Sequence, residues 1–211
     1  MDPKIKARLE SKSGKTLYGY QKLAIDEMMQ KFVEKQTNFN LLFQLPTGGG
    51  KTVIFSELAK KFILSTGKKV LILTHRIELL GQTSKLLSEI GVPNKVINAK
   101  VKDLDDGEEH WCYVAMVETL NNRINDEQMV FEDLGLVIVD EAHYNSFRKL
   151  FKHFRDQILL GVTATPLSSN IKLPLNDNYN ELIVGESISS LVDGGYLSRA
   201  KTYNYDVNLR A

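Results

Sequence analysis

The chain has 211 residues, of which 43% are hydrophobic and 25% are charged, so its composition is that of a globular protein and not of a disordered one. Its net charge of +1 excludes a histone-like basic protein but is compatible with a local basic surface. The single cysteine, Cys112, excludes an intrachain disulfide framework, and the lack of a long apolar run or apolar leader predicts a cytoplasmic protein with no membrane partner.

The predicted elements begin with a polar, basic stretch at residues 1–16, expected to form an arm or a short helix, and a helix over residues 20–34. After these, short apolar strands alternate with longer amphipathic helices, an order typical of βαβ units and a parallel sheet. The strands are expected at residues 40–45, 69–74, 95–98, 111–115, 134–140 and 158–162, and the helices between them at 51–65, 76–90, 117–125 and 147–154.

The last part of the chain has a weaker pattern. Residues 167–181 contain asparagine clusters and Pro174 without a clear period, and they are expected to form a long surface loop. A short helix is expected at residues 187–192, ended by two glycines, and a strand at residues 202–207.

A glycine-rich segment joins the strand at residues 40–45 to the helix that begins at Lys51. Glycines allow backbone N–H groups to converge on an anion, and the helix N-terminus adds a partial positive charge. Lys51 is placed to reach the β- and γ-phosphates of a nucleotide, and the Thr52 hydroxyl to ligate Mg²⁺. The alternative is a glycine-rich turn before a surface helix, and Leu45 stands where the usual phosphate loop has its first glycine. The expected cofactors are therefore ATP and Mg²⁺, bound by Thr47, Gly48, Gly49, Gly50, Lys51 and Thr52.

Two adjacent carboxylates, Asp140 and Glu141, follow the most apolar of the predicted strands. Such a pair at the end of a buried strand is unfavourable unless it serves a metal or a proton transfer. Asp140 is expected to hold Mg²⁺, partly through water, and Glu141 to orient and deprotonate the attacking water. The alternative is that these acids cap the helix that begins near Phe147. Lys51, Asp140 and Glu141 are thus the predicted catalytic residues, expected to converge around one triphosphate.

These two segments resemble motifs of the superfamily 2 helicases: residues 47–52 are similar to motif I, and residues 140–143, Asp-Glu-Ala-His, to motif II. Shorter matches follow in the family's order. Residues 17–21 resemble the adenine-recognition motif, residues 73–76 motif Ia, residues 114–120 the next nucleic-acid-contacting motif, and residues 161–166 motif III. The resemblance covers residues 17–209 and is greatest to RadD-like, XPB-like and restriction-subunit-like DNA translocases.

The resemblance implies an α/β fold of the RecA-like P-loop NTPase type, with a mostly parallel sheet flanked by helices. It assigns residues 17–185 to the first motor domain, after a basic arm at 1–16, and residues 186–211 to a linker toward a second RecA-like domain. By similarity, Gln21 recognises adenine, although its alternative is an ordinary polar residue at a helix start. The residues implied in nucleic-acid contact or in coupling it to the nucleotide are Thr74, His75, Arg76, Thr119, His143, Thr163 and Thr165.

The activity implied is that of an ATP-dependent helicase or translocase, a nucleoside-triphosphatase that moves on DNA. DNA is expected over RNA because Thr-His-Arg at 74–76 and Thr-Ala-Thr at 163–165 are more similar to the DNA-acting branch. No motif that supplies an arginine finger follows Pro166. We therefore expect a fragment that binds nucleotide but hydrolyses it slowly, since a missing arginine finger lowers rates by about 10³–10⁵. An RNA helicase domain, or a nucleic-acid-binding module with a vestigial ATP site, are the alternatives.

Overall fold

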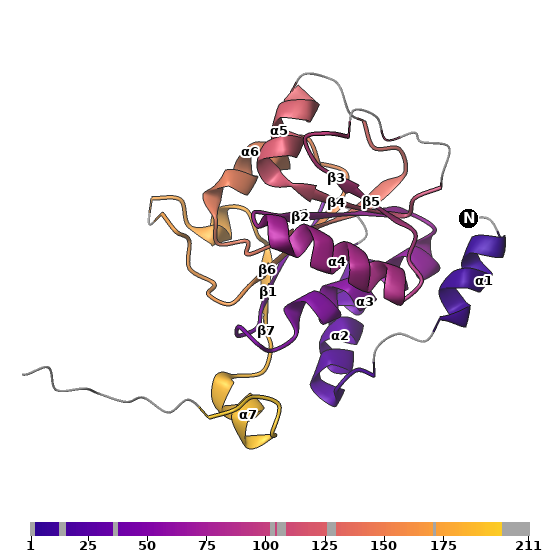
Figure 1. The fold of residues 1–211 in the computed structure, drawn as a ribbon. Coiled ribbons are helices and arrows are strands. Elements are labelled where there is room, and N and C mark those ends of the chain that lie inside the picture. Colours follow the sequence, from indigo (N-terminus) through magenta and orange to yellow (C-terminus); the bar gives the residue numbers. More distant parts are fainter. Residues whose placement is uncertain are drawn as a thin grey trace, which may run out of the picture.

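The structure, a computed structural model, describes residues 3–12, 16–35, 38–101, 104, 109–125, 130–170 and 172–199. Within these residues, seven strands form one sheet in the order β3-β4-β2-β5-β6-β1-β7, and every neighbouring pair is parallel (Figure 1). The α/β prediction is confirmed. The strands are β1 (Asn40–Gln44), β2 (Lys69–Thr74), β3 (Asn94–Ile97), β4 (Cys112–Met116), β5 (Leu134–Asp140), β6 (Ile158–Thr163) and β7 (Glu181–Val184).

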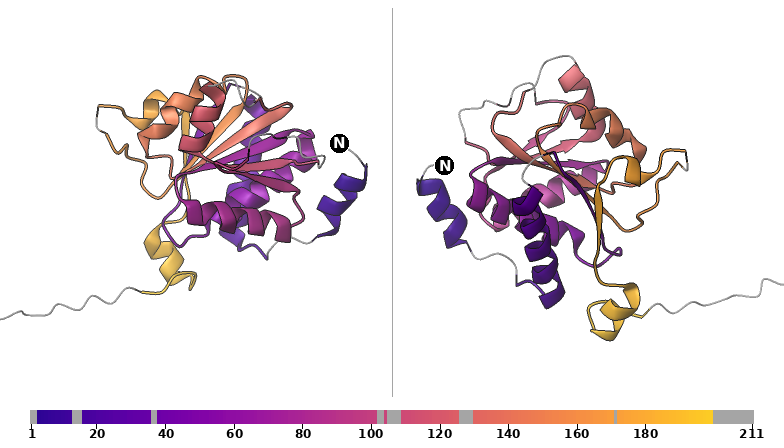
Figure 2. Two further views of the ribbon diagram at one scale, coloured as in Figure 1. Left: turned by 45° about the horizontal axis from the view of Figure 1, so that its top comes forward. Right: turned by 180° about the vertical axis from the view of Figure 1, so that it is seen from behind.

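Helices cover both faces of the sheet (Figures 1 and 2). One face carries α2, α3 and α4, and the other carries α5 and α6, while α7 lies apart near the start of α2. No helix in the described part of the chain is long and apolar enough to cross a membrane. The helices are α1 (Pro3–Ser11), α2 (Gly19–Lys35), α3 (Lys51–Thr66), α4 (Ile77–Glu89), α5 (Val117–Asn125), α6 (Arg148–Phe151) and α7 (Ile188–Asp193), with single 3₁₀ turns at Asn145–Phe147 and Leu175–Asp177.

Two hydrophobic clusters, one on each face of the sheet, hold these layers together. Because successive side chains of a strand point to opposite faces, neighbouring residues of β1 join different clusters: Phe43 packs with α2 and α3, and Leu42 packs with the cluster beneath α6. All seven residues of β5 are buried, as expected of a central parallel strand covered on both faces. The centre of the sheet, where β5 lies between β2 and β6, is therefore covered on both faces.

The basic N-terminal stretch forms the short helix α1, which packs on the domain. Leu9 is fully buried in the cluster beneath α2–α4, and the Nζ atom of Lys60 in α3 donates a hydrogen bond to the carbonyl oxygen of Lys12 at 2.6 Å. Hydrophobic burial and this bond attach the helix to α3.

Two sequence expectations differ from the structure. The helix expected at 147–154 is shorter, since a 3₁₀ turn precedes α6 and α6 ends at Phe151, although Phe147, Leu150 and Phe154 are buried as expected. Residues 167–181 form the expected long connection, but its last residue begins β7, an edge strand that the sequence pattern missed. The strand expected at 202–207 lies outside the described residues.

Candidate nucleotide-binding site

The glycine-rich loop lies between the end of β1 and the start of α3, as the sequence predicts. Gly48 and Gly50 adopt left-handed conformations with φ of 84° and 81°, which residues with a β-carbon rarely adopt. Gly50 is the N-cap of α3, and no side chain caps this helix end. The first N–H groups of α3 lack a capping side chain, so this helix end can accept an anion.

Two residues of α2 pack against this loop from behind. The Tyr20 hydroxyl donates a hydrogen bond to the carbonyl oxygen of Gly49 at 2.9 Å. The side chain of Gln21 is buried, and its Oε1 atom accepts the backbone N–H of Tyr18 at 3.0 Å. Its Nε2 atom lies 2.5 Å from the point at which a β-carbon at Gly50 would stand. Gln21 therefore contacts the loop directly, while its predicted contact with adenine stays a prediction.

Lys51 begins α3 and turns back over the loop. Its Nζ atom donates a hydrogen bond to the carbonyl oxygen of Leu45 at 3.3 Å. Its positive charge also lowers the pKa of Asp140, and such an effect on a charged group requires proximity. Lys51, which follows β1 and the loop, and Asp140, which ends β5, thus lie at the same edge of the parallel sheet, while their convergence around a triphosphate stays a prediction. Thr47 is exposed in the loop, and Thr52 is half-buried next to Lys51.

Asp140 ends β5 with only 5% of its surface exposed. The pKa of its carboxyl group is raised from 3.8 to about 6, chiefly by burial and also by the neighbouring Glu141, while Lys51, the Glu141 N–H and Arg76 oppose this rise. The Glu141 N–H donates a hydrogen bond to Oδ1 of Asp140 at 3.0 Å. Glu141 itself has a φ of 53°, a left-handed conformation that is uncommon for a residue with a long side chain and is found most often at functional sites.

Polar side chains join the turn after β5 to the turn after β6. Nδ1 of His143 lies 3.0 Å from Oγ1 of Thr163 and 3.4 Å from Oε2 of Glu141. The Thr163 hydroxyl also donates to the carbonyl oxygen of Thr165 at 2.8 Å. His143 therefore contacts Glu141 directly, and Thr163 and Thr165 are connected to Glu141 through His143.

The residues after β2 differ in exposure. Thr74 is buried, with Oγ1 accepting the N–H of Arg76 at 3.3 Å, whereas Arg76 is exposed. Nε2 of His75 lies 2.8 Å from the Ser146 hydroxyl, and Nδ1 lies 3.5 Å from a Glu118 carboxylate oxygen. Burial lowers the pKa of His75, and Glu118 opposes this.

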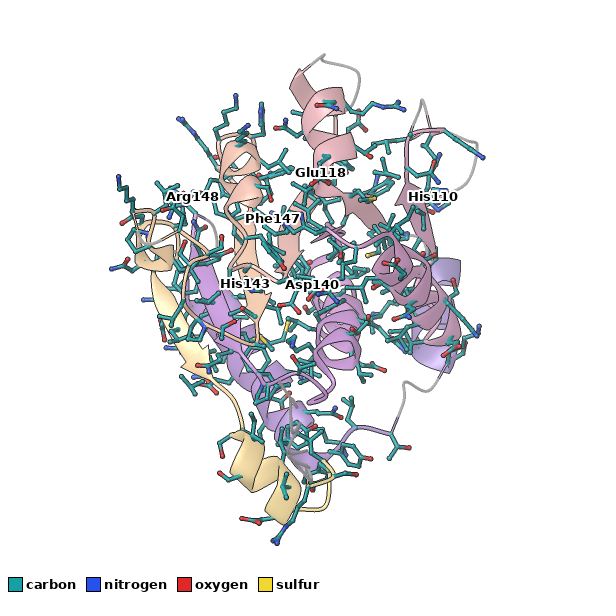
Figure 3. The ribbon with its side chains drawn as sticks, turned by 60° about the vertical axis from the view of Figure 1, so that its left-hand side comes forward. His110, Glu118, Asp140, His143, Phe147 and Arg148 are labelled. Carbon is teal, nitrogen blue, oxygen red and sulfur yellow. The ribbon has the colours of Figure 1, made fainter. Side chains whose placement is uncertain are left out.

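His75 also packs against aromatic rings, 4.4 Å from Phe147 and 4.9 Å from Tyr144 between ring centroids. Figure 3 labels Glu118, His143 and Phe147, which surround this region. The side chain of His75 is thus held within the protein, while Thr119, the remaining predicted contact, is half-buried on α5.

The donor set fits magnesium bound together with a nucleotide. Among the described residues, no group of three or more His, Cys, Asp or Glu side chains could hold a metal alone. Magnesium is usually held by one or two carboxylates with phosphate oxygens and water, which matches one buried carboxylate, Asp140, at the edge of the sheet where Lys51 begins α3.

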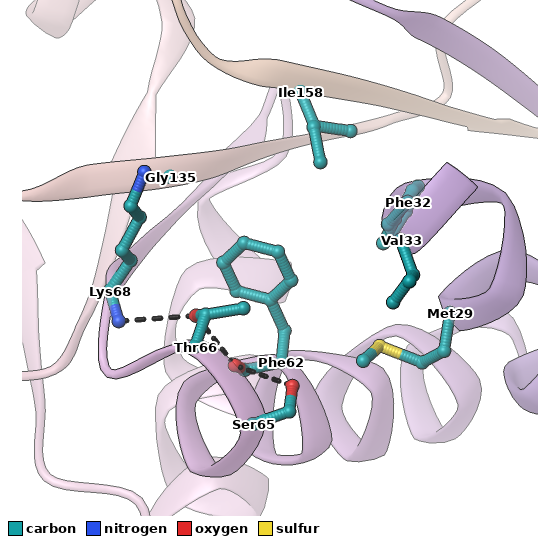
Figure 4. Close-up of a pocket in the computed structure, with 9 residues that line it drawn as sticks. All are labelled: Met29, Phe32, Val33, Phe62, Ser65, Thr66, Lys68, Gly135 and Ile158. Atoms are coloured by element: carbon teal, nitrogen blue, oxygen red, sulfur yellow. Dashed lines mark hydrogen bonds between the residues drawn. The ribbon is translucent and has the colours of Figure 1, made fainter. Parts of the chain in front are cut away.

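An apolar cavity of about 240 Å³ lies at the opposite edge of the sheet, between α2, α3 and the starts of β5 and β6 (Figure 4). The hydroxyls of Ser65 and Thr66 in its wall both donate to the carbonyl oxygen of Phe62. Its remaining lining is largely apolar and is unsuited to a triphosphate. It is formed by Met29, Phe32, Val33, Phe62, Ser65, Thr66, Lys68, Gly135 and Ile158.

The sequence expectations did not include two contacts of the loop, those of Tyr20 and Leu197. Tyr20 lies in the segment that resembles the adenine-recognition motif and was given no role of its own, and Leu197 was assigned only to the linker. A methyl group of Leu197 lies 2.9 Å from the point at which a β-carbon at Gly48 would stand. The Gly-Gly-Tyr-Leu run at 194–197 was visible in the sequence, but nothing in its pattern pointed to the loop.

Comparison with known proteins identifies the family of this chain. Residues 14–168 match the family described as "Type III restriction enzyme, res subunit". IRC3 of Saccharomyces cerevisiae, named as a candidate ATP-dependent helicase, is 31% identical over 90% of this chain and 29% of its own length. QP509L of African swine fever virus, named as a candidate ATP-dependent RNA helicase, is 30% identical over 72% of this chain and 29% of its own length. The chain thus spans about 30% of the length of each of these relatives.

The fold is also found in a solved structure. The type ISP restriction-modification enzyme LlaGI, as a nuclease-deletion mutant in complex with a DNA substrate mimic, aligns with a TM-score of 0.67 at 17% identity. The alignment covers 86% of this chain and 21% of that chain. At this identity the likeness concerns the architecture of the domain.

Proposed function

Because the chain belongs to the family of type III restriction enzyme res subunits, and is a helicase-family motor domain that depends on ATP, we propose that it is the motor domain of an enzyme that couples ATP hydrolysis to movement along DNA. The observation that carries this proposal is that the glycine-rich loop with Lys51, between β1 and α3, and the buried Asp140, at the end of β5, lie at the same edge of one parallel sheet. A phosphate loop and an acidic pair brought together in this way form a site for phosphoryl transfer to water.

Each residue of the site has a distinct task. Lys51 exchanges its bond to the Leu45 carbonyl oxygen for one to a β- or γ-phosphate oxygen, which is stronger because both partners are charged. Thr52 and Asp140 would hold Mg²⁺, partly through water. When bound, the metal neutralises negative charge on the phosphates.

Glu141 orients the attacking water and accepts one of its protons. The water oxygen forms a bond to the γ-phosphorus while the bond to the bridging oxygen breaks, and the electron pair stays on ADP. The imidazole of His143, 3.4 Å from a Glu141 carboxylate oxygen, holds that side chain beside Thr163. In this way the carboxylate is connected to the turn after β6.

We further propose that residues 17–185 form the motor domain and that residues 186–211 lead toward a second RecA-like domain. The nucleic acid would contact Arg76 and its neighbours at the carboxyl edge of the sheet. DNA is favoured by the resemblance of motifs Ia and III to DNA-acting helicases and by the DNA substrate mimic in the LlaGI structure. RNA is the second candidate, supported by the name of QP509L. Competition binding among single-stranded DNA, duplex DNA and RNA distinguishes the two.

The nucleotide site is tested by comparing two lysines of α3. Lys51→Ala should abolish the thermal shift produced by Mg–ATP, whereas Lys61→Ala should retain it, because Lys61 pairs with Asp26. Saturation at a hundredfold excess over Kd raises stability by about 2.7 kcal/mol. Glu141→Gln should bind nucleotide normally but lose hydrolysis. If the unaltered chain shows no shift with Mg–ATP, the proposal is wrong and a binding module with a vestigial site is favoured.

A further inference from the structure

The first turn of α2 reaches the glycine-rich loop through a hydrogen bond to which the proposed function gives no role. The Tyr20 hydroxyl donates to the carbonyl oxygen of Gly49 at 2.9 Å. Burial raises the pKa of Tyr20 above its usual value, while a hydrogen bond with Gln21 opposes this. The phenol is therefore protonated at neutral pH and remains a donor.

This bond fixes the orientation of a peptide unit in the loop. In a trans peptide, the carbonyl oxygen and the next N–H point in opposite directions, and the described residues contain no cis peptide bond. Because Tyr20 holds the Gly49 carbonyl oxygen toward α2, the N–H of Gly50 points to the opposite side of the loop. Gly50 is the N-cap of α3, so its N–H lies at the helix end where an anion would bind.

The ring of Tyr20 is itself held by two other tyrosines, and we call Tyr18, Tyr20 and Tyr196 the tyrosine cluster. The centroid of the Tyr196 ring lies 5.1 Å from that of Tyr20 and 4.6 Å from that of Tyr18. Edge-to-face and tilted contacts at these distances are favourable. Tyr20 therefore packs against a ring from a distant part of the chain.

Tyr196 comes from the segment that follows α7, far along the chain from the loop. Its N–H and that of Leu197 both donate to the carbonyl oxygen of Leu191, at 2.8 and 3.0 Å. This turn places Leu197 against Gly48, at 2.9 Å from the position of a β-carbon there. Residues 194–197 thus contact the loop twice, through the tyrosine cluster and through Leu197.

We propose that Tyr20 is a positioning residue for phosphate binding, and that Tyr196 holds Tyr20 in place. The affinity of the loop for phosphates then depends on the segment that leaves the domain after α7. This inference rests on the proposed function, since orienting the Gly50 N–H matters only if the loop binds phosphates. It is distinct from adenine recognition, which is the task predicted for Gln21.

Tripolyphosphate separates the two tasks because it carries the phosphates without a base. We propose to measure Kd for Mg–ATP and for magnesium tripolyphosphate by calorimetry. Tyr20→Phe keeps the ring and removes only the donor, and it should weaken both ligands by the same factor, about five- to tenfold, the loss expected from one hydrogen bond. Tyr196→Ala should weaken both in the same way, whereas Tyr196→Phe, which keeps the ring, should bind like the unaltered chain.

These measurements distinguish a failure of the positioning role from a failure of the proposed function. If Lys51→Ala abolishes the binding of both ligands while Tyr20→Phe binds them normally, the positioning role is wrong and the proposed function stands. If Lys51→Ala still binds them, the proposed function is wrong. If Tyr20→Phe weakens ATP but not tripolyphosphate, the tyrosine acts through the base, which also overturns the inference. Denaturation in the absence of ligand checks that each variant is folded.

Discussion

Gln21 and Gly50 are in such close contact that Nε2 of the amide occupies the space that a β-carbon at position 50 would need, at 2.5 Å. The two residues belong to different helices, α2 and α3. Their contact means that the loop owes its shape to the residues packed behind it as well as to its own glycines. Position 50 thus requires glycine for two reasons, its left-handed backbone conformation and the lack of space for a β-carbon.

Gly50→Ala should therefore lower nucleotide affinity by tenfold or more. Gly67→Ala is the matched control, because Gly67 also has a left-handed φ, of 66°, at the other end of α3 but has nothing within 4 Å of a β-carbon. It should lose only about 1–2 kcal/mol of stability and bind nucleotide normally. Calorimetric titration and urea denaturation test both. Normal ATP binding by Gly50→Ala would contradict the prediction.

Asp140→Asn should stabilise the nucleotide-free chain at pH 7–8. The pKa of Asp140 is raised from 3.8 to about 6 in the folded state, so between these pH values the folded chain binds the proton more tightly than the unfolded chain. The free energy of unfolding therefore falls as pH rises through this window. The advantage of Asn should be on the order of 2–3 kcal/mol at pH 8 and vanish near pH 4. Urea denaturation across this range measures it, and a less stable Asn variant at pH 8 would refute the prediction.

Arg76 and His75 should differ in their effect on nucleic-acid binding. Arg76 is exposed, whereas His75 is held by Ser146 and Glu118. Arg76→Ala should weaken binding to single-stranded DNA and reduce the slope of log K against log salt by about 0.7, as expected for one lost phosphate contact. His75→Ala should leave the slope unchanged. Fluorescence anisotropy of labelled DNA at several salt concentrations distinguishes them; equal slopes for both variants would contradict the prediction.

Tyr179→Phe should stabilise the domain by about 1 kcal/mol. The Tyr179 hydroxyl is buried and has no hydrogen-bond partner among the residues described, and burial raises the pKa of the phenol, which is therefore neutral. Its ring and hydroxyl pack on Gly161, at 2.5 Å from the position of a β-carbon. Gly161→Ala should consequently destabilise the domain by about 1–3 kcal/mol, and less when Tyr179 is already Phe. Purely additive effects in this double-mutant cycle would disprove the contact.

Much of the fold was predictable because its signals are local. The central strand β5 is a nearly continuous apolar run that ends at Asp140, and the glycine-rich loop is preceded by a strand and followed by a helix. The edge strand β7 was missed because it has four residues and only Ile183 is fully buried. Such a strand is defined by its pairing with β1 and not by its own composition.

The position of Lys51 and Asp140 at one edge of the sheet was predictable, but several side-chain orientations were not. Lys51 and Asp140 could be placed together because the carboxyl ends of parallel strands share one edge. The inward position of His75 depends on Glu118 and Ser146, which lie on other elements. The contact of Tyr196 with Tyr20 likewise joins residues distant in the chain. Contacts of this kind leave no periodic pattern in the sequence.

The place of β1 between β6 and β7 has a consequence for biosynthesis. On the ribosome, β1 emerges before either of its partners, whose residues begin at 158 and 181. At translation rates of about 5–20 residues per second, more than a hundred residues of delay correspond to roughly 5–20 s. Throughout this interval the apolar strand that precedes the phosphate loop has no neighbour to pair with, so the nascent chain is exposed to aggregation and to chaperones until its last strands are made.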